Sequence, residues 1–277
     1  VSAAGREEAE LLRYYCETHI RHAGNKPAYY GRPFVLEDWQ WENIWLPVFG
    51  TGRTGKGGVF ERHYRTALIG LPRDFGKTEL ICAMMLSEAN MNPVRMGQYG
   101  IVAYSKEQAS KILATLADMV SQDRDMRQLW DSGKHEISNR ETGAVIKVFP
   151  YSEAALQSWH FNVLVADELH VWKSDSVYSA IRSGMGNVDN SLLLAITTAS
   201  EARSGFLWDW INGNATEGVK SILDDPTAYM WWHGANDSDN IESEKVWERI
   251  AIPSWVTVGR IRDLRASMRK RDFERYT

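Results

Sequence analysis

Apolar positions change their spacing along this chain, from a helical pattern near the N-terminus to an alternation of strand-like and helix-like runs after residue 60. Runs with the length and apolar character of buried strands cover residues 66–71, 100–104, 144–149, 163–166 and 192–196. Residues 78–89 are apolar on nearly every side, which predicts a buried helix. This alternation is typical of an α/β fold with a mainly parallel central sheet and helices on both faces.

Further helices are predicted around this core. Residues 105–108 form a capping box, and the helix that they open carries apolar side chains on one face as far as residue 120. Near-helical spacing predicts two earlier helices over 5–22 and 38–49. The glycine-rich segment 50–58 is expected to be a flexible loop. It contains a literal GxGxxG, but it neither follows a convincing strand nor opens a helix, as a dinucleotide-binding fingerprint must.

Composition and charge narrow the class of protein. The chain has 277 residues, of which 44% are hydrophobic and 25% charged, as in ordinary globular proteins. A net charge of −4 excludes a uniformly basic nucleic-acid-binding surface but allows a local basic patch. The two cysteines make no disulfide framework, and no uncharged apolar run reaches the ~18 residues of a membrane span. We therefore expect a soluble, intracellular protein with no membrane partner.

The strongest candidate for chemistry is LPRDFGKT, residues 71–78, between a predicted strand and the buried helix. A loop in this place can turn backbone N–H groups and a helix N-terminus toward an anion. Lys77 would reach the β- and γ-phosphates of a nucleotide, and the Thr78 hydroxyl would bind Mg²⁺. The usual pattern has glycine where this chain has Leu71, and Gly70 comes one position too early. The alternative is a chance GKT at the start of a helix.

A second candidate is the pair of carboxylates that ends the apolar run Val-Leu-Val-Ala at 163–166. Asp167 suits coordination of Mg²⁺, and Glu168 suits activation of the attacking water as a general base. The alternative is that the two acids open the next helix, since acids favour helix N-termini. Together with the phosphate loop, the pair favours a nucleotide hydrolase.

Two weaker candidates flank these segments. Thr197 and Thr198 end the apolar run 192–196, where a polar residue can sense the γ-phosphate; two threonines that merely close a strand are the alternative. Upstream, Gln40 could pair with the edge of adenine and Trp39 could stack on the base, whereas a surface glutamine beside a core tryptophan is the alternative. The histidines show no HxxxH or HExxH spacing, so no zinc site is expected.

Taken in order, these segments resemble the large terminase subunit of tailed bacteriophages. The matching segments are WQWENIWLPVFG on the adenine side, LPRDFGKT with an arginine before its GKT, LVADELHVWKS with the DELH form of the acidic motif, LLLAITTAS as the coupling motif, and EKVWERIAIPSW before an inter-domain linker. The resemblance implies a P-loop NTPase fold of the ASCE type. It divides the chain into an adenine-side helical segment (1–60), the ATPase core (61–200), and the end of the ATPase domain with a linker toward a nuclease domain (201–277).

The resemblance also assigns roles to single residues. It makes Glu168, Lys77 and Arg73 catalytic, and Thr78 and Asp167 ligands of Mg²⁺. Thr197 and Thr198 would couple hydrolysis to movement. The residues that would hold ATP are Trp39, Gln40, Pro72, Arg73, Asp74, Phe75, Gly76, Lys77 and Thr78.

The implied function is ATP hydrolysis that drives double-stranded DNA into a procapsid in the host cytoplasm. The implied partners are DNA, the portal protein, the small terminase subunit and further copies of the chain in a ring on the portal. The family's nuclease domain is expected to lie outside these 277 residues, so we expect no nuclease activity from them. We also expect the isolated chain to be mostly monomeric and a poor ATPase.

Three questions stay open at this level. A helicase-like ATPase, or a nucleotide-binding assembly module that hydrolyses nothing alone, would share the phosphate loop and the acidic pair. An arginine that completes a neighbour's site cannot be chosen among four candidates, Arg124, Arg127, Arg140 and Arg182. Residues 260–275 carry a cluster of basic side chains, namely Arg260, Arg262, Arg265, Arg269, Lys270, Arg271 and Arg275. The cluster is either a solvated helix or a patch that follows the DNA backbone.

Overall fold

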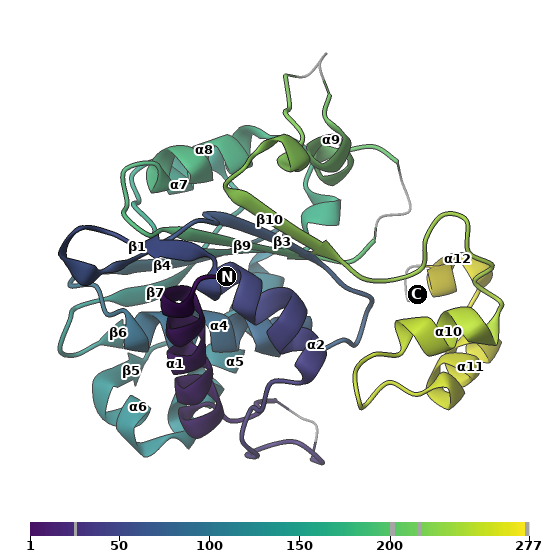
Figure 1. Ribbon diagram of the computed structural model, residues 1–277, viewed down its shortest axis with the longest axis horizontal. Helices are drawn as coiled ribbons and strands as arrows, with labels where there is room; N and C mark the ends of the chain where they lie inside the picture. Colours follow the sequence, from purple (N-terminus) through teal and green to yellow (C-terminus); the bar gives the residue numbers. More distant parts are fainter. Residues whose placement is uncertain (25–26, 200–202, 215–217, 275–276) are drawn as a thin grey trace.

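A computed structural model describes residues 1–24, 27–199, 203–214, 218–274 and 277. Its centre is an eight-stranded sheet in the order β10-β3-β9-β8-β4-β7-β6-β5 (Figure 1). The strands are β10 (Ala228–Trp232), β3 (Thr66–Gly70), β9 (Leu192–Thr197), β8 (Val163–Asp167), β4 (Gln98–Ala103), β7 (Val145–Phe149), β6 (Glu136–Asn139) and β5 (Trp130–Ser132). The first six run parallel to one another, β6 pairs antiparallel with β7, and β5 pairs antiparallel with β6. The predicted α/β fold and all five predicted strands are confirmed.

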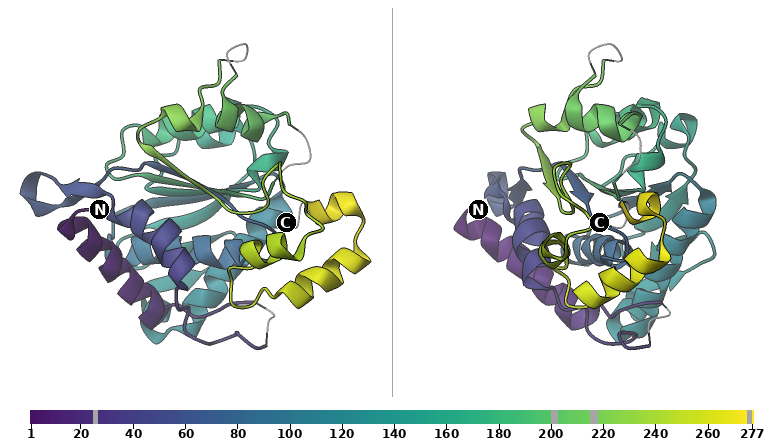
Figure 2. Two further views of the ribbon diagram at one scale, coloured as in Figure 1. Left: turned by 45° about the vertical axis from the view of Figure 1, so that its right-hand side comes forward. Right: turned by 90° about the vertical axis from the view of Figure 1, so that its right-hand side faces the viewer.

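Helices cover both faces of the sheet, as predicted (Figures 1 and 2). One face carries α1 (Ala3–His19), α4 (Lys77–Met91), α5 (Lys106–Gln122) and α6 (Arg124–Leu129). The other carries α7 (Glu153–Leu156), α8 (Ser176–Met185) and α9 (Phe206–Asn212). The helix α4 is buried on almost all sides, and the capping box of α5 forms between Ser105 and Gln108, also as predicted. Central strands covered on both faces are apolar throughout, which explains why β3, β8 and β9 were easy to predict.

The segment between α1 and β3 contains more regular structure than its sequence predicts. Residues 38–50 form a nearly continuous helix made of α2 (Asp38–Gln40), a π-helical turn η1 (Trp41–Trp45) and α3 (Leu46–Gly50). The glycine-rich segment is not a loop throughout: β1 (Gly52–Thr54) pairs antiparallel with β2 (Phe60–Arg62) across η2 (Lys56–Gly58). Gly57 and Gly58 take left-handed backbone, so the glycines that suggested flexibility instead make the turn of a hairpin.

The C-terminal part adds an edge strand and a small helical group. After η3 (Leu169–Val171) and η4 (Ile222–Asp224), the strand β10 pairs with β3 at the end of the sheet. Helices α10 (Glu244–Ile250), α11 (Val258–Ser267) and α12 (Lys270–Glu274) then gather at one end of the sheet, where Figure 2 shows them in yellow-green and yellow. The region after residue 200 is therefore joined to the core by strand pairing.

Both cysteines lie in the core beneath the sheet. Cys16 is 0% and Cys82 1% exposed, and burial raises the pKa of both thiols. Their Sγ atoms contact the carbonyls of Phe34 and Ile112 and form no disulfide. Among the described helices, none combines the length and the apolar character that a membrane crossing requires.

Candidate nucleotide site

The predicted phosphate loop lies where β3 passes into α4, beside the carboxyl end of β9. The backbone N–H of Leu71 donates to the carbonyl of Thr197 at 3.1 Å, so the loop starts in contact with the neighbouring strand. Gly70 belongs to the sheet: a Cβ at this position would lie 2.1 Å from the Trp232 ring on β10. The early glycine is therefore a packing requirement, while Leu71 is buried and has no left-handed backbone that would call for glycine.

The loop turns into the helix through two residues in left-handed conformation, Asp74 (φ 65°) and Gly76 (φ 75°). Left-handed backbone next to helical backbone forms a concave row of N–H groups that binds anions. Phe75 between them is 1% exposed and anchors the loop against the ring of His233. The loop thus combines a fixed backbone with the N-terminus of a long helix.

Lys77 folds back into its own loop. Its Nζ donates to the carbonyls of Pro72 at 2.7 Å and Leu71 at 3.2 Å. Burial lowers the pKa of Lys77 to about 8, although the charges of Glu168 and Asp167 act in the opposite direction. Among the described residues, this largely desolvated ammonium donates to carbonyls, which it can exchange for phosphate oxygens.

The acidic pair stands at the end of β8. Burial and the charge of Glu168 raise the pKa of Asp167 to about 7. Burial also acts to raise the pKa of Glu168, but the contact with His170 and the charges of His170 and Lys77 outweigh it and leave that pKa below its ordinary value. The pKa values of the two carboxylates are therefore shifted in opposite directions, and Glu168 is ionised at neutral pH.

Glu168 has unusual backbone for a residue with a side chain, φ 53° and ψ 49°. Left-handed backbone at a non-glycine residue costs free energy and is found preferentially at functional sites. Its Oε2 atom is buried and lies 2.9 Å from His170 Nδ1. An ionised carboxylate held in this way can accept a proton, as a general base must.

The end of β9 lies next to the acidic pair, as the coupling assignment requires. Thr197 is 0% and Thr198 3% exposed, and the Thr197 hydroxyl accepts from the backbone N–H of His170 at 3.1 Å. With its carbonyl bound to Leu71, Thr197 touches both the phosphate loop and the acidic segment. Of the two threonines, Thr197 has the contacts that could link these parts.

A cavity of ≈310 Å³ opens beside Gly76, between the N-terminal segment and the segment before α11. Its walls include Tyr29, Phe34, Gln40 and Trp255. The Gln40 side-chain oxygen accepts from the backbone N–H of Glu37 at 3.0 Å, while its Nε2 has no hydrogen bond to another described residue. A free amide N–H₂ in an aromatic-walled cavity beside a phosphate loop fits the edge of a base.

The structure places Trp39 outside this cavity. Its ring is 9% exposed and stacks on Trp231 with centroids 5.8 Å apart. The aromatic rings that do line the cavity are Tyr29 and Trp255, which lie edge to face 6.5 Å apart. Sequence reasoning missed both, although the segment IPSW that contains Trp255 was among those singled out.

The segment that carries Trp255 is bound to the phosphate loop itself. The Trp255 indole N–H donates to the carbonyl of Asp74 at 2.9 Å, and the backbone N–H of Ser254 lies 3.1 Å from both carboxylate oxygens of Glu37. The base-side cavity is therefore closed by a part of the chain that is remote in sequence from the loop.

Comparison with known proteins agrees with this geometry. The family described as "Terminase large subunit, ATPase domain" matches residues 43–212, more than half of the chain. The chain belongs to this family. No curated protein matches the sequence.

Solved structures of terminases share the fold. The crystal structure of the HK97 bacteriophage large terminase superposes with a TM-score of 0.76 at 19% identity, over 97% of this chain and 54% of that one. The ATPase domain of the Thermus phage P74-26 large terminase gives 0.53 at 15% identity, over 77% and 87%. The large terminase of a thermophilic bacteriophage in complex with ADP gives 0.50 at 14% identity, over 77% and 47%. This terminase ATPase domain thus spans about half the length of the HK97 chain.

The four arginines considered for a neighbour's site lie away from this terminase domain's own phosphate loop. Arg182 donates to the Thr66 hydroxyl at 2.9 Å, at the opposite end of β3. Arg140 pairs with Asp131 on the outer strands, and Arg124 and Arg127 belong to α6 nearby. The geometry leaves all four as candidates.

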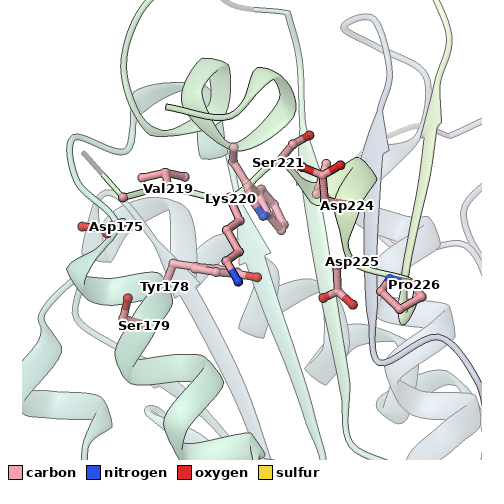
Figure 3. A pocket seen from close by; sticks show the side chains of 12 residues that line it. Asp175, Tyr178, Ser179, Val219, Lys220, Ser221, Asp224, Asp225 and Pro226 are labelled. Carbon is pink, nitrogen blue, oxygen red and sulfur yellow. The ribbon is translucent and has the colours of Figure 1, made fainter. Parts of the chain in front are cut away.

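A further cavity of ≈400 Å³ lies on the face covered by α8 and α9 (Figure 3). Tyr178 and Trp210 form part of its wall, and Lys220 extends across it toward Tyr178, with Asp224 and Asp225 on the other side. None of its lining residues also lines the base-side cavity. It is not part of the nucleotide site of this terminase domain.

Proposed function

We propose that this chain is the motor part of a phage large terminase, which hydrolyses ATP and uses the energy to move double-stranded DNA into a procapsid. The observation that carries the proposal is the convergence of Lys77, Asp167 and Glu168 at the carboxyl ends of β3 and β8, beside a base-sized cavity. Two carboxylates of different acidity and a desolvated lysine beside a phosphate loop are the components that phosphoryl transfer to water needs.

In this mechanism the base enters the cavity that Tyr29 and Trp255 line, and the Gln40 amide orients it. Lys77 leaves the carbonyls of Leu71 and Pro72 and binds the phosphates, assisted by Arg73, an exposed residue of the same loop. Glu168 accepts a proton from water while the water oxygen attacks the γ-phosphorus. The bond from that phosphorus to the β,γ-bridging oxygen breaks, and ADP and phosphate leave.

We further propose that Thr78 and Asp167 hold Mg²⁺, which would neutralise charge on the phosphates. The donors fit this ion, because a hydroxyl and a carboxylate are the hard oxygen ligands that Mg²⁺ prefers. The raised pKa of Asp167 also reflects negative charge that a cation would relieve. Thr197, with Thr198, would couple the occupied site to the rest of the domain.

The partners that we propose are DNA, the portal protein, the small terminase subunit and further copies of the chain in a ring on the portal, in the host cytoplasm. Turnover measured against protein concentration separates the alternatives. A rate that rises sharply with concentration indicates a site completed by a neighbour, strand separation indicates a helicase, and nucleotide binding with no turnover at any concentration indicates an assembly module.

Glu168→Gln tests the chemistry. Because the variant keeps the shape of the side chain but loses its charge, we expect nucleotide to bind as before and hydrolysis to be lost. The measurements are the Kd for ATP and single-turnover hydrolysis with protein in excess. Hydrolysis at the wild-type rate by Glu168→Gln would contradict the proposed function, as would loss of binding.

A further inference from the structure

His170, the last residue of DELH, lies between Glu168 and the end of β9. Its Nδ1 atom is 2.9 Å from Glu168 Oε2, 3.3 Å from the Thr197 hydroxyl and 3.5 Å from the Thr198 hydroxyl. Only 11% of its side chain is exposed. One nitrogen atom thus faces the proposed general base on one side and the two proposed coupling hydroxyls on the other.

The backbone around His170 holds the ring in this place. After the left-handed Glu168, the short η3 turn closes with hydrogen bonds from Val171 to Glu168 and from Trp172 to Leu169. The indole of Trp172 then donates to the carbonyl of Asp167 at 3.2 Å, which fixes the turn to the end of β8. The turn thus fixes the backbone of His170, and the ring is held by its contacts with Glu168, Thr197 and Thr198.

Thr197 connects the same ring to the phosphate loop. Its hydroxyl accepts from the His170 backbone N–H and donates to the Thr198 carbonyl at 3.0 Å, while its own carbonyl accepts from Leu71. A continuous line of contacts therefore runs from the first residue of the loop through Thr197 and His170 to the Glu168 carboxylate. A shift of the loop on phosphate binding has a direct route to the proposed base.

We propose that His170 is a positioning residue, which sets the orientation of the Glu168 carboxylate according to the state of the phosphate loop as relayed by Thr197. This inference rests on the proposed function, since it assigns Glu168 its role as base. His170 itself touches no reacting atom in this scheme. It acts on the rate of hydrolysis and not on the binding of nucleotide.

The test compares three substitutions by single-turnover hydrolysis of Mg·ATP and by the Kd for ATP. His170→Ala should lower the hydrolysis rate by about 100-fold with Kd changed less than twofold, because a displaced base loses most of its effect. His170→Asn places an amide nitrogen near the position of Nδ1 and should recover at least about tenfold of that loss. His170→Leu fills the same volume without a polar atom and should not.

A second measurement tests the link through Thr197. If the two side chains act in one line, His170→Ala combined with Thr197→Val should be no slower than the slower single variant. If the loss of hydrolysis rate in the double variant equals the product of the two single losses, the two residues act independently and the link is overturned. Thermal unfolding of each variant shows whether the fold is kept.

The possible failures are distinguishable. If Glu168→Gln is inactive but His170→Ala hydrolyses ATP at the wild-type rate, the positioning role is wrong and the proposed function stands. Weaker ATP binding by His170→Ala, or equal loss in the Asn and Leu variants, would also overturn the positioning role. If Glu168→Gln remains active, the proposed function itself fails.

Discussion

The guanidinium of Arg260 lies 2.9 Å from the carboxylate of Asp74, and this contact joins α11 to the left-handed corner of the phosphate loop. The pair is exposed, so it adds little to the free energy of unfolding. The contact instead helps to position α11 against the loop, because the indole of Trp255, just before α11, binds the carbonyl of the same aspartate. The conformation of the loop and the position of the C-terminal helices are therefore set together.

Trp255 should contribute to binding through its ring more than through its N–H. Trp255→Ala is expected to weaken ATP binding roughly tenfold, because a ring stacked on a base is worth about 1–3 kcal/mol. Trp255→Phe keeps an aromatic face, loses the hydrogen bond to Asp74, and should bind within about threefold of wild type. The Kd for ATP is the measurement, and Trp208→Ala, a change at an exposed tryptophan on α9, is the matched control. Equal affinity in Trp255→Ala and the control would remove Trp255 from the base site.

Nucleotide binding should depend on pH through Lys77. The pKa of this lysine is about 8 in the free protein, so its ammonium is intact below that pH and is lost as the pH rises through it. Phosphate oxygens stabilise the charged form, so binding above pH 8 should take up a proton, and affinity should fall between pH 7 and 9. Calorimetry at pH 8.5 in two buffers of different ionisation enthalpy measures this uptake. Lys77→Arg stays charged and is the control; equal proton uptake by that variant would contradict the assignment.

The buried ion pair between Arg62 and Glu88 provides a prediction on stability. Both side chains are more than nine-tenths buried, and burial raises the pKa of Glu88. Arg62→Met leaves that carboxylate without its partner and should lower the free energy of unfolding by about 3 kcal/mol at pH 8. Because Glu88 can then take up a proton in the folded state more readily than in the unfolded state, the loss should be smaller at pH 5.

Chemical denaturation at both pH values measures this effect. Arg53→Met breaks an exposed pair with Glu61 and should cost less than 1 kcal/mol. The double variant Arg62→Met with Glu88→Leu should recover most of the loss, since no unpaired charge remains. An Arg62→Met variant as stable as Arg53→Met would show that the buried pair has no role in stability.

The basic cluster at 260–275 should not govern DNA binding. Arg260, Arg262 and Arg265 pair with Asp74, Glu244 and Glu242, which favours the interpretation of α11 as a structural helix. Arg275 and the side chain of Arg271 lie outside the described residues. We expect Arg265, Arg269 and Lys270 changed together to Ala to leave the salt dependence of duplex binding unchanged. A slope reduced by about one unit per lost contact would instead identify the cluster as a DNA-binding patch.

The central strands and the phosphate loop could be predicted because local pattern determines them. The runs at β3, β8 and β9 are buried on both faces, and those at β8 and β9 end in polar residues, Asp167 with Glu168 and Thr197 with Thr198. The edge strand β10 could not be predicted in this way. Its side chains are only partly buried, it has one neighbouring strand, and it follows an acidic stretch.

The base-side cavity depends on contacts between distant segments, and of the residues that line it the sequence indicated Gln40 and Gly76. Trp39 is next to Gln40 in sequence, but its ring packs on Trp231 of β10, a strand that the sequence did not predict. Trp255 reaches the site because its segment is bound to Asp74 and Glu37, and no periodicity in the sequence indicates these contacts. The role of Gly70 depends in the same way on Trp232 across the sheet.

The burial of Cys16 and Cys82 makes this chain convenient for site-specific labelling. Folded protein should react slowly with maleimides, so a cysteine introduced on the surface would be modified selectively without removal of the native thiols. A dye pair on α11 and on the exposed end of α5 could then report the distance between the C-terminal helices and the core in the free, ATP-bound and ADP-bound protein. The thiols of Cys16 and Cys82 would become reactive when the protein unfolds, so the rate at which they are labelled measures how often the surrounding core unfolds.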